Sequence, residues 1–272
     1  MDISHREPVT VRTVIDSLLR PLASPLPENT SDRLLIGDLD APVTGIVTAF
    51  MPTLSVIERA AESGANLVIG HEGLFFSHHE RKEEVPEGRI AALKRQKIEA
   101  LGMNVFRFHD GLHRYAPDGV TEGLIRALGW TSHVREQRPE AALLTLPEAS
   151  LEEIAAEIKQ RLGLASLRIV GDPAMRCSRT GVLVGYRGGG EAVIPLLERG
   201  DADLIVCGEG PEWETPEYVR EANRLGRPCG LIVLGHAESE VPGMQLLAER
   251  LAEQFPGLPV SHLRENAIFR TL

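Results

Sequence analysis

The chain has 272 residues, of which 43% are hydrophobic and 25% charged. These proportions are ordinary for a globular protein, and the length allows one large domain or two modest ones. With 29 Lys and Arg against 39 Asp and Glu, the formal net charge is −10. This charge argues against a nucleic acid or an anionic membrane as the partner. A small-molecule substrate is expected, because an acidic chain can still bind a phosphorylated compound through a bound cation.

The cysteines and the first residues of the chain indicate the cellular compartment of the protein. Cys177, Cys207 and Cys229 are scattered and lack CxxC spacing, which is typical of buried thiols in a reducing compartment. The first residues carry Asp, Glu and Arg and no apolar core of a signal peptide. No apolar run approaches the ~20 residues that a membrane-spanning helix needs. We expect a soluble, cytoplasmic protein.

The first half of the chain is predicted to contain a helix, then a Pro-rich link that ends at Asp32, and then strands that alternate with helices. The apolar periodicity and the Gly positions predict these elements: helix 10–20, strand 45–50, helix 54–64, strand 66–70, a charged excursion at 79–88, helix 89–101 and strand 104–108. His71 directly follows the second of these strands, and His109 directly follows the third.

The second half repeats this alternation. A turn and a strand over 139–150 end at Ser150, a plausible N-cap for the next helix. The elements predicted after it are helix 151–163, strand 167–171, strand 181–186, helix 191–200, strand 203–208, helix 216–226, strand 230–235, helix 243–255, and edge strands at 259–263 and 267–272. Alternating strands and helices predict the α/β class, with helices covering the sheets.

The two halves also match residue by residue. Residues 55–73 align without gaps on 192–210, which places Leu67 on Leu204 and Glu72 on Glu209. Upstream, 45–50 matches 181–186; downstream, after a small gap, His109 falls on His236 and His113 on Glu240. We infer an internal duplication, with similar α/β halves at 1–135 and 136–272 and a metal site in the cleft between them. Convergence of two unrelated αβ units is the alternative.

Candidate metal ligands follow apolar strands in both halves, where loops converge in α/β sheets. They are His71, Glu72, His109, His113, His236 and Glu240. Imidazole and carboxylate together suit Zn, Mn or Fe(II), and a carboxylate can bridge two ions. Ordinary structural roles remain open: an HxxxE pair is commonly a surface pair on a helix, and a His-Glu pair at a strand end is commonly a hydrogen-bonded pair.

Three neighbouring features bear on the site. Pro242 suits the first turn of a helix, so 237–239 are predicted to form a turn that folds Glu240 back. His78 and His79 lie in a charged loop and are expected to be solvated, a metal contact being the lesser alternative. The loop 187–190, Arg-Gly-Gly-Gly, precedes a helix and could hold a phosphate, although it lacks the Lys-Ser/Thr of a P-loop. A tight strand-to-helix turn is the other interpretation of this loop.

Taken together, these segments resemble the NIF-three-like (NGG-interacting-factor-three-like) family, a group of dinuclear metal-centre hexamers also called GTP cyclohydrolase type 2 homologues. HEGLFF (71–76) resembles the family's HHPLFF-like motif, and HDGLH (109–113) its HTNLD-like motif. GHAESE (235–240) resembles GHxxTE, and CGEG (207–210) a TGE-like element. The resemblance spans nearly the whole chain in order.

The resemblance implies a ligand set with two departures. His71, His236 and Glu240 match the family's ligands unchanged, whereas its second His is Glu72 here and its Asp is His113. It also implies a toroidal hexamer of two-domain protomers and one or two divalent ions in each chain.

We expect a hydrolase that uses metal-activated water on a nucleotide or a phosphorylated small molecule, by cyclohydrolase-like ring opening or phosphoester hydrolysis. Two ions ~3.5–4 Å apart would hold a bridging hydroxide. Glu240 would bridge them, and Glu72 or Glu209 would transfer protons. The alternatives are a non-catalytic metal-binding scaffold or metal chaperone, and a nucleotide-binding regulator that uses Gly188–Gly190.

Overall fold

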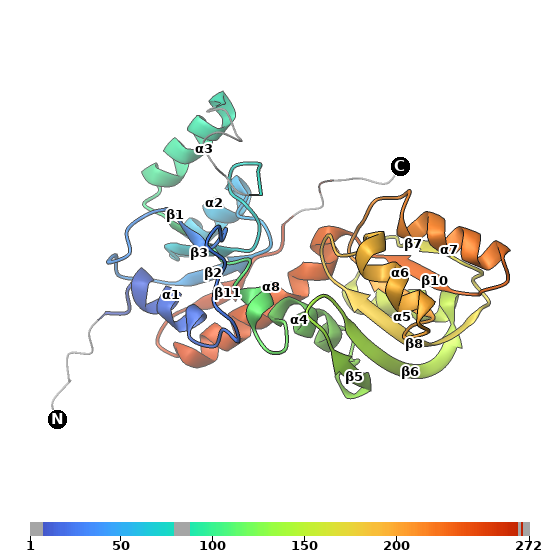
Figure 1. Ribbon diagram of the computed structural model, residues 1–272. Helices are drawn as coiled ribbons and strands as arrows, with labels where there is room; N and C mark the ends of the chain where they lie inside the picture. The colour runs from blue at the N-terminus through green and yellow to red at the C-terminus, as the bar shows by residue number, and fades with distance from the viewer. Residues whose placement is uncertain (1–7, 79–87, 266–267, 269–272) are drawn as a thin grey trace. The chain divides into compact units, whose positions relative to one another are not determined.

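The computed structural model describes residues 8–78, 88–265 and 268, and shows a mixed α/β chain with two sheets (Figure 1). The described residues up to Gly119 form one compact unit with those from Met244 onward, and Val120–Gly243 form the second. The helices, including two 3-10 turns, are α1 Val11–Leu19, α2 Leu54–Glu62, α3 Arg89–Ala100, η1 Leu112–Arg114, α4 Gly119–Ala127, η2 Thr131–His133, α5 Leu151–Leu162, α6 Gly190–Glu198, α7 Thr215–Arg224 and α8 His236–Gln254. The strands are β1 Arg33–Ile36, β2 Ile46–Ala49, β3 Leu67–Gly70, β4 Asn104–Arg107, β5 Val134–Gln137, β6 Ala142–Ser150, β7 Arg168–Val170, β8 Arg176–Leu183, β9 Leu204–Cys207, β10 Gly230–Val233 and β11 Val260–His262.

The first unit is built on a sheet of order β1-β4-β3-β2-β11. β2, β3, β4 and β11 run parallel, and β1 joins the edge antiparallel to β4. One face packs against α2 and α3, through a buried core that includes Val47, Val56, Ile57, Val68, Ile98 and Val105. On β2, Thr48 has the opposite orientation to its neighbour Val47, and its hydroxyl donates to the carbonyl of Met244 in α8.

The second unit is built on a sheet of order β5-β6-β8-β9-β10-β7. β8, β9 and β10 are parallel, and β7 is antiparallel to β10. α6 and α7 cover one face, with a buried core that includes Leu183, Val193, Leu196, Ile205, Val219 and Leu231. Helix α5 begins at a capping box in which Ser150 and Glu153 each bond the other's backbone amide, so the predicted N-cap is confirmed.

The two sheets repeat one strand order. Each has an antiparallel edge strand followed by three parallel strands: β1-β4-β3-β2 in the first unit and β7-β10-β9-β8 in the second. The prediction of two similar α/β halves is therefore confirmed. The compact units do not coincide with the predicted boundaries 1–135 and 136–272, because α8 carries the chain back and β11 pairs with β2.

The strand register corrects the alignment on either side of its ungapped part. Leu67 pairs with Ile46, and its counterpart Leu204 pairs with Thr180, so Ile46 corresponds to Thr180 and not to Val182. This two-residue shift leaves each side chain on the predicted face.

The predicted alignment of the two halves also contains a smaller error after β4 and β10. Gly70 pairs with Arg107 and Cys207 with Val233, so His109 is the second residue beyond its strand and His236 is the third. The predicted equivalences of His109 with His236, and of His113 with Glu240, are each wrong by one residue. The position of the gap in the alignment could not be found from the sequence, because only the strand pairing shows which residues of the two units are equivalent.

Other differences concern element boundaries. α8 begins at His236 and contains Pro242, so the predicted turn at 237–239 is wrong. The hydroxyl of Ser239 donates to the carbonyl of His236, and the amide of Ser239 bonds to Gly235, which stabilises this first turn. The short elements β1, α4 and β5 were not predicted. The predicted excursion at 79–88, except its last residue, and most of the predicted strand 267–272 lie outside the described residues.

The helices in the described part of the chain include none with both the length and the apolar character that spanning a bilayer requires.

His262 on β11 gives the first testable prediction. The Thr48 hydroxyl has one proton, which it donates to Met244, so at 3.1 Å it accepts from Nδ1 of His262. Nε2 is buried without a hydrogen-bond partner among the described residues. Protonating it would bury a charge, and burial lowers the pKa of His262 from 6.5 to about 4.

His262 therefore has a lower pKa in the folded chain than in the unfolded chain, so between these two pKa values only the unfolded chain binds the proton. We expect the free energy of unfolding of the metal-free protein to decrease as the pH falls from 6.5 to about 4. In His262→Gln this part of the decrease should be lost. Urea unfolding in the presence of a chelator, measured across this range for both proteins, tests this. Parallel curves would contradict it.

Candidate metal centre

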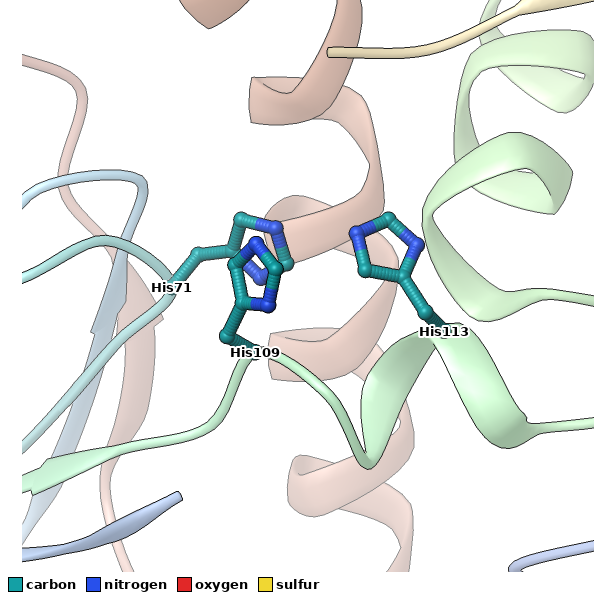
Figure 2. A group of neighbouring side chains, drawn as sticks. All are labelled: His71, His109 and His113. Carbon is teal, nitrogen blue, oxygen red and sulfur yellow. The ribbon is translucent and has the colours of Figure 1, made fainter. Parts of the chain in front are cut away.

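Three histidines meet at one edge of the first unit's sheet. His71 directly follows β3, His109 is the second residue after β4, and His113 lies in η1. Because β3 and β4 are neighbouring parallel strands, their C-terminal ends lie side by side and deliver His71 and His109 together. Figure 2 shows the three rings facing a common space.

The spacing of the rings suits a shared ion. The ring centroid of His109 lies 4.5 Å from that of His71 and 5.0 Å from that of His113, and the third pair is 5.1 Å apart. One nitrogen from each ring lies within 4.8 Å of the others. This geometry could hold one metal ion.

Each ring has one nitrogen held by an acceptor. Nδ1 of His71 lies 3.2 Å from the carbonyl of Phe108, Nδ1 of His109 3.0 Å from Asp110, and Nδ1 of His113 2.9 Å from Asp118. Carbonyl and carboxylate oxygens only accept, so all three rings carry their proton on Nδ1. Nε2 is then the nitrogen that each ring could offer to a metal ion, and metal-binding histidines commonly have such partners.

The electrostatics keep His109 in the form that binds metal. Burial, and then the neighbouring His71, lower the pKa of His109 to about 4, so its imidazole is neutral at pH 7. The hydrogen bond from His109 holds the pKa of Asp110 far below its usual range, so Asp110 is ionised. A neutral imidazole bonded to a carboxylate is a stronger ligand than an isolated one.

Glu72 faces a buried cation. Its Oε2 accepts from Nη2 of Arg107 at 3.0 Å, and its Oε1 lies 3.8 Å from Nε2 of His109. The Arg107 guanidinium is 1% exposed and also donates to the carbonyls of His71 and His78. Arg107 therefore holds the segment from His71 to His78 against β4.

Glu72, His78 and His109 form a second group with metal-ligand spacing. Nη2 of Arg107 lies 3.3 Å from Nδ1 of His78, and a guanidinium can only donate, so this contact places the proton of His78 on Nε2. The nearby positive charge also disfavours a cation here. The three-histidine group is thus the better metal site. His78 is exposed, as expected, but it packs against His109 with ring centroids 5.0 Å apart; His79 lies outside the described residues.

The residues that hold the three histidines in place were not predicted. Asp32 accepts from the backbone amides of His109, Asp110 and Gly111, while Asp118 and Arg107 make the contacts given above. Burial raises the pKa of Asp32, although the three amides oppose this. A carboxylate directly after His109 was the only local signal. Asp32 stands at the end of the Pro-rich link, where nothing in the sequence marks it.

The second unit contains the remaining predicted residues. His236 Nδ1 lies 2.9 Å from Oε1 of Glu209, and its Nε2 lies 3.2 Å from Oε2 of Glu240 in the same helix. Glu209 thus relates to His236 as Asp110 relates to His109. This contact is the arrangement expected if Glu209 supports a ligand and does not itself bind the ion, a role that stays a prediction.

Close backbone contacts explain why the second unit has Gly208 where the first has His71. A Cβ at Gly208 would lie 2.4 Å from the carbonyl oxygen of Gly185 and 2.6 Å from Oγ of Ser239. Gly185 has a positive φ of 59°, and a Cβ there would lie 2.2 Å from Oε1 of Glu240. No side chain fits at either position, so this unit cannot place a histidine there.

The glycine loop before α6 is occupied by a side chain of the chain itself. Gly189 is the N-cap of α6, and the amide of Gly190 donates to Oε2 of Glu214 at 2.7 Å. A carboxylate therefore takes the place at this helix N-terminus where a phosphate would bind. The tight-turn interpretation fits this arrangement better than the phosphate-binding one.

Known proteins resemble this chain in sequence and in fold. A Clostridium acetobutylicum protein named "GTP cyclohydrolase 1 type 2 homolog" is 23% identical over 227 residues, which is 80% of each chain. A Staphylococcus aureus hypothetical protein of solved structure has a TM-score of 0.76 and 21% identity over 98% of this chain and 100% of its own. The Bacillus cereus protein related to NIF3 has a TM-score of 0.74 and 15% identity, with 98% and 99% covered. These structures share the fold.

The family described as Duf34/NIF3 (NGG1p interacting factor 3) matches residues 18–267 by its sequence profile. The match covers both compact units and every candidate ligand. The chain belongs to the Duf34/NIF3 family.

Proposed function

We propose that the chain is a metal-dependent hydrolase whose first unit binds a divalent ion through His71, His109 and His113. The observation that supports the proposal is a group of three imidazoles, each with Nδ1 bonded to an acceptor, in which one nitrogen of each ring lies within 4.8 Å of the others. Three histidines with an open fourth position are a catalytic zinc arrangement, and Mn and Fe(II) also accept imidazole.

The ion would supply water of lowered pKa as a nucleophile at neutral pH. The residues of this chain would hold the ion and manage protons. Glu72 lies beside His109 and keeps one oxygen on Arg107, so its other oxygen can accept a proton. In the second unit His236 and Glu240, which match the family motif, are proposed as further ligands, and Glu209 as a proton-transfer residue or outer partner.

A nucleotide or another phosphorylated small molecule is the proposed substrate. The Clostridium relative's name, "GTP cyclohydrolase 1 type 2 homolog", makes GTP the first substrate to test. The chain carries a net charge of −10, so it would bind a phosphate best through a bound cation.

The metal ligands give the second prediction. His71→Ala and His113→Ala each remove one of three nitrogens, so metal per chain after dialysis should fall to a small fraction of the wild-type value. His236→Ala and Glu240→Ala should lower it too. Elemental analysis of purified variants measures this, with the half-buried His133, which lies outside the three-histidine group, replaced by Ala as the control. Unchanged metal content in the His71 and His113 variants would remove the basis of the proposal.

Turnover assays with GTP and phosphoesters separate an enzyme from a metal-binding scaffold or chaperone. The enzyme should hydrolyse at least one of these compounds only when metal is bound. Exchangeable metal without turnover would support the scaffold.

Glu209 gives the third prediction. Its carboxylate contacts Nδ1 of His236, so it can support the ring or move a proton without binding the ion. Glu209→Gln should keep full metal content and lower turnover by about 10²–10⁴-fold, as for a lost general base. Loss of metal from this variant would make Glu209 a ligand. Intact metal and intact turnover would make it merely structural.

The fourth prediction concerns assembly. By resemblance to its family we propose a closed homohexamer, which for a chain of 29.7 kDa means six times that mass. Multi-angle light scattering at micromolar concentration measures the mass directly. A stable monomer would contradict the proposal.

A further inference from the structure

We infer that Asp32 is a positioning residue of the metal centre, which holds the backbone that carries His109 and His113 in place for the ion. The inference rests on the proposed function. It concerns a segment, Thr30–Asp32, that contains none of the proposed ligands.

Strand topology brings Asp32 to the site. It directly precedes β1, which pairs antiparallel with β4 so that Arg33 lies opposite Arg107. The beginning of β1 therefore adjoins the end of β4, from which the chain runs on to His109. An antiparallel edge strand at this position is what allows a residue 77 positions earlier in the chain to reach His109.

The Asp32 carboxylate binds three successive backbone amides. Oδ1 accepts from the amide of His109 at 2.7 Å and from that of Asp110 at 2.8 Å, and Oδ2 accepts from Gly111 at 2.7 Å. Asp32 is 9% exposed, and buried amides need such partners. Hydrogen bonds to a charged acceptor are stronger than those between neutral groups. The carboxylate thus fixes the turn after β4.

This turn leads straight into the element that carries His113. The amide of His113 bonds to the carbonyl of His109, and the amide of Arg114 bonds to that of Gly111. A displacement at 109–111 would therefore move two of the three proposed ligands together. Space is also limited, because a Cβ at Gly111 would lie 2.3 Å from the ring of Phe108 and 2.8 Å from Oδ2 of Asp32.

The same segment also holds the ring of His109. The hydroxyl of Thr30 and the amide of Ser31 donate to Oδ2 of Asp110 at 2.8 and 3.0 Å, while Oδ1 of Asp110 lies 3.0 Å from Nδ1 of His109. Residues 30–32 therefore act on His109 twice, through its backbone and through its ring. Outer residues of this kind commonly change metal affinity 10–100-fold when replaced.

Asp32→Asn tests the inference with little change in size. The amide oxygen can still accept, but the NH₂ group would face a backbone N–H and release one end of the turn. We expect the dissociation constant for Zn²⁺, measured by competition with a chelating dye, to rise about 10–100-fold. The visible absorption of the Co²⁺-loaded protein should change, because it reports ligand geometry.

Asp203→Asn is the matched control. Asp203 in the second unit accepts from the amides of Ser178 and Arg179, both at 3.1 Å, and so caps backbone in a similar way. Both variants should lower the Tm of the metal-free protein. Only Asp32→Asn should also reduce the rise in Tm on adding Zn²⁺, because that rise follows metal affinity.

A second variant covers the case in which Asp32→Asn does not fold. Thr30→Val removes the hydroxyl that holds Asp110 and should raise the Zn²⁺ dissociation constant by a smaller factor, with an altered Co²⁺ spectrum. Wild-type affinity and spectrum in every variant that folds would overturn the inference. If His71→Ala and His113→Ala also bind metal like the wild type, the metal centre itself has failed, which is a different result.

Discussion

The parallel pairing of β3 with β4 is the constraint on which the candidate site depends. The pairing of Gly70 with Arg107 fixes His71 one residue and His109 two residues beyond the same level of the sheet. Neighbouring strands lie about 4.8 Å apart, which is close to the 4.5 Å between these two rings. Three carboxylates then hold the segment that follows β4. Asp32 binds the backbone of the turn, Asp110 contacts the ring of His109, and Asp118 contacts the ring of His113.

Features that depend on residues close together in the sequence could be predicted. The α/β alternation, the repeat and the polar ends of β3 and β4 follow from apolar runs and the residues that end them, so the sequence indicates that His71, His109 and His113 lie near one sheet edge; their role as ligands stays a prediction. Asp32 and Arg107 could not be predicted, because their partners lie 29 to 79 positions away and only the folded chain brings them close. The beginning of α8 was missed because Pro242 favours a helix start, and the contacts of Ser239 that stabilise an earlier start are not visible in the sequence.

The two repeated units share a strand order but differ in the residues that come after each strand. His71 comes directly after β3, whereas Gly208 comes directly after β9, where the backbone of Gly185 leaves no room for a side chain. Each unit nevertheless keeps a histidine whose Nδ1 contacts a carboxylate, His109 with Asp110 and His236 with Glu209. Both units thus contain an imidazole paired with a carboxylate, although the residues do not stand at equivalent positions.

The two departures from the family's motifs compensate each other in charge. The motifs that this chain resembles have a second His and an Asp where it has Glu72 and His113, so both sets contain one imidazole and one carboxylate at these positions. Each new side chain has a partner suited to it: Arg107 donates to the carboxylate of Glu72, and Asp118 accepts from the ring of His113. Reversing only Glu72 to His would leave Arg107 buried without its anion, which is costly. Arg107 and Asp118 therefore suit the side chains that this chain has at positions 72 and 113, and the first unit has three imidazoles at the position proposed for the ion.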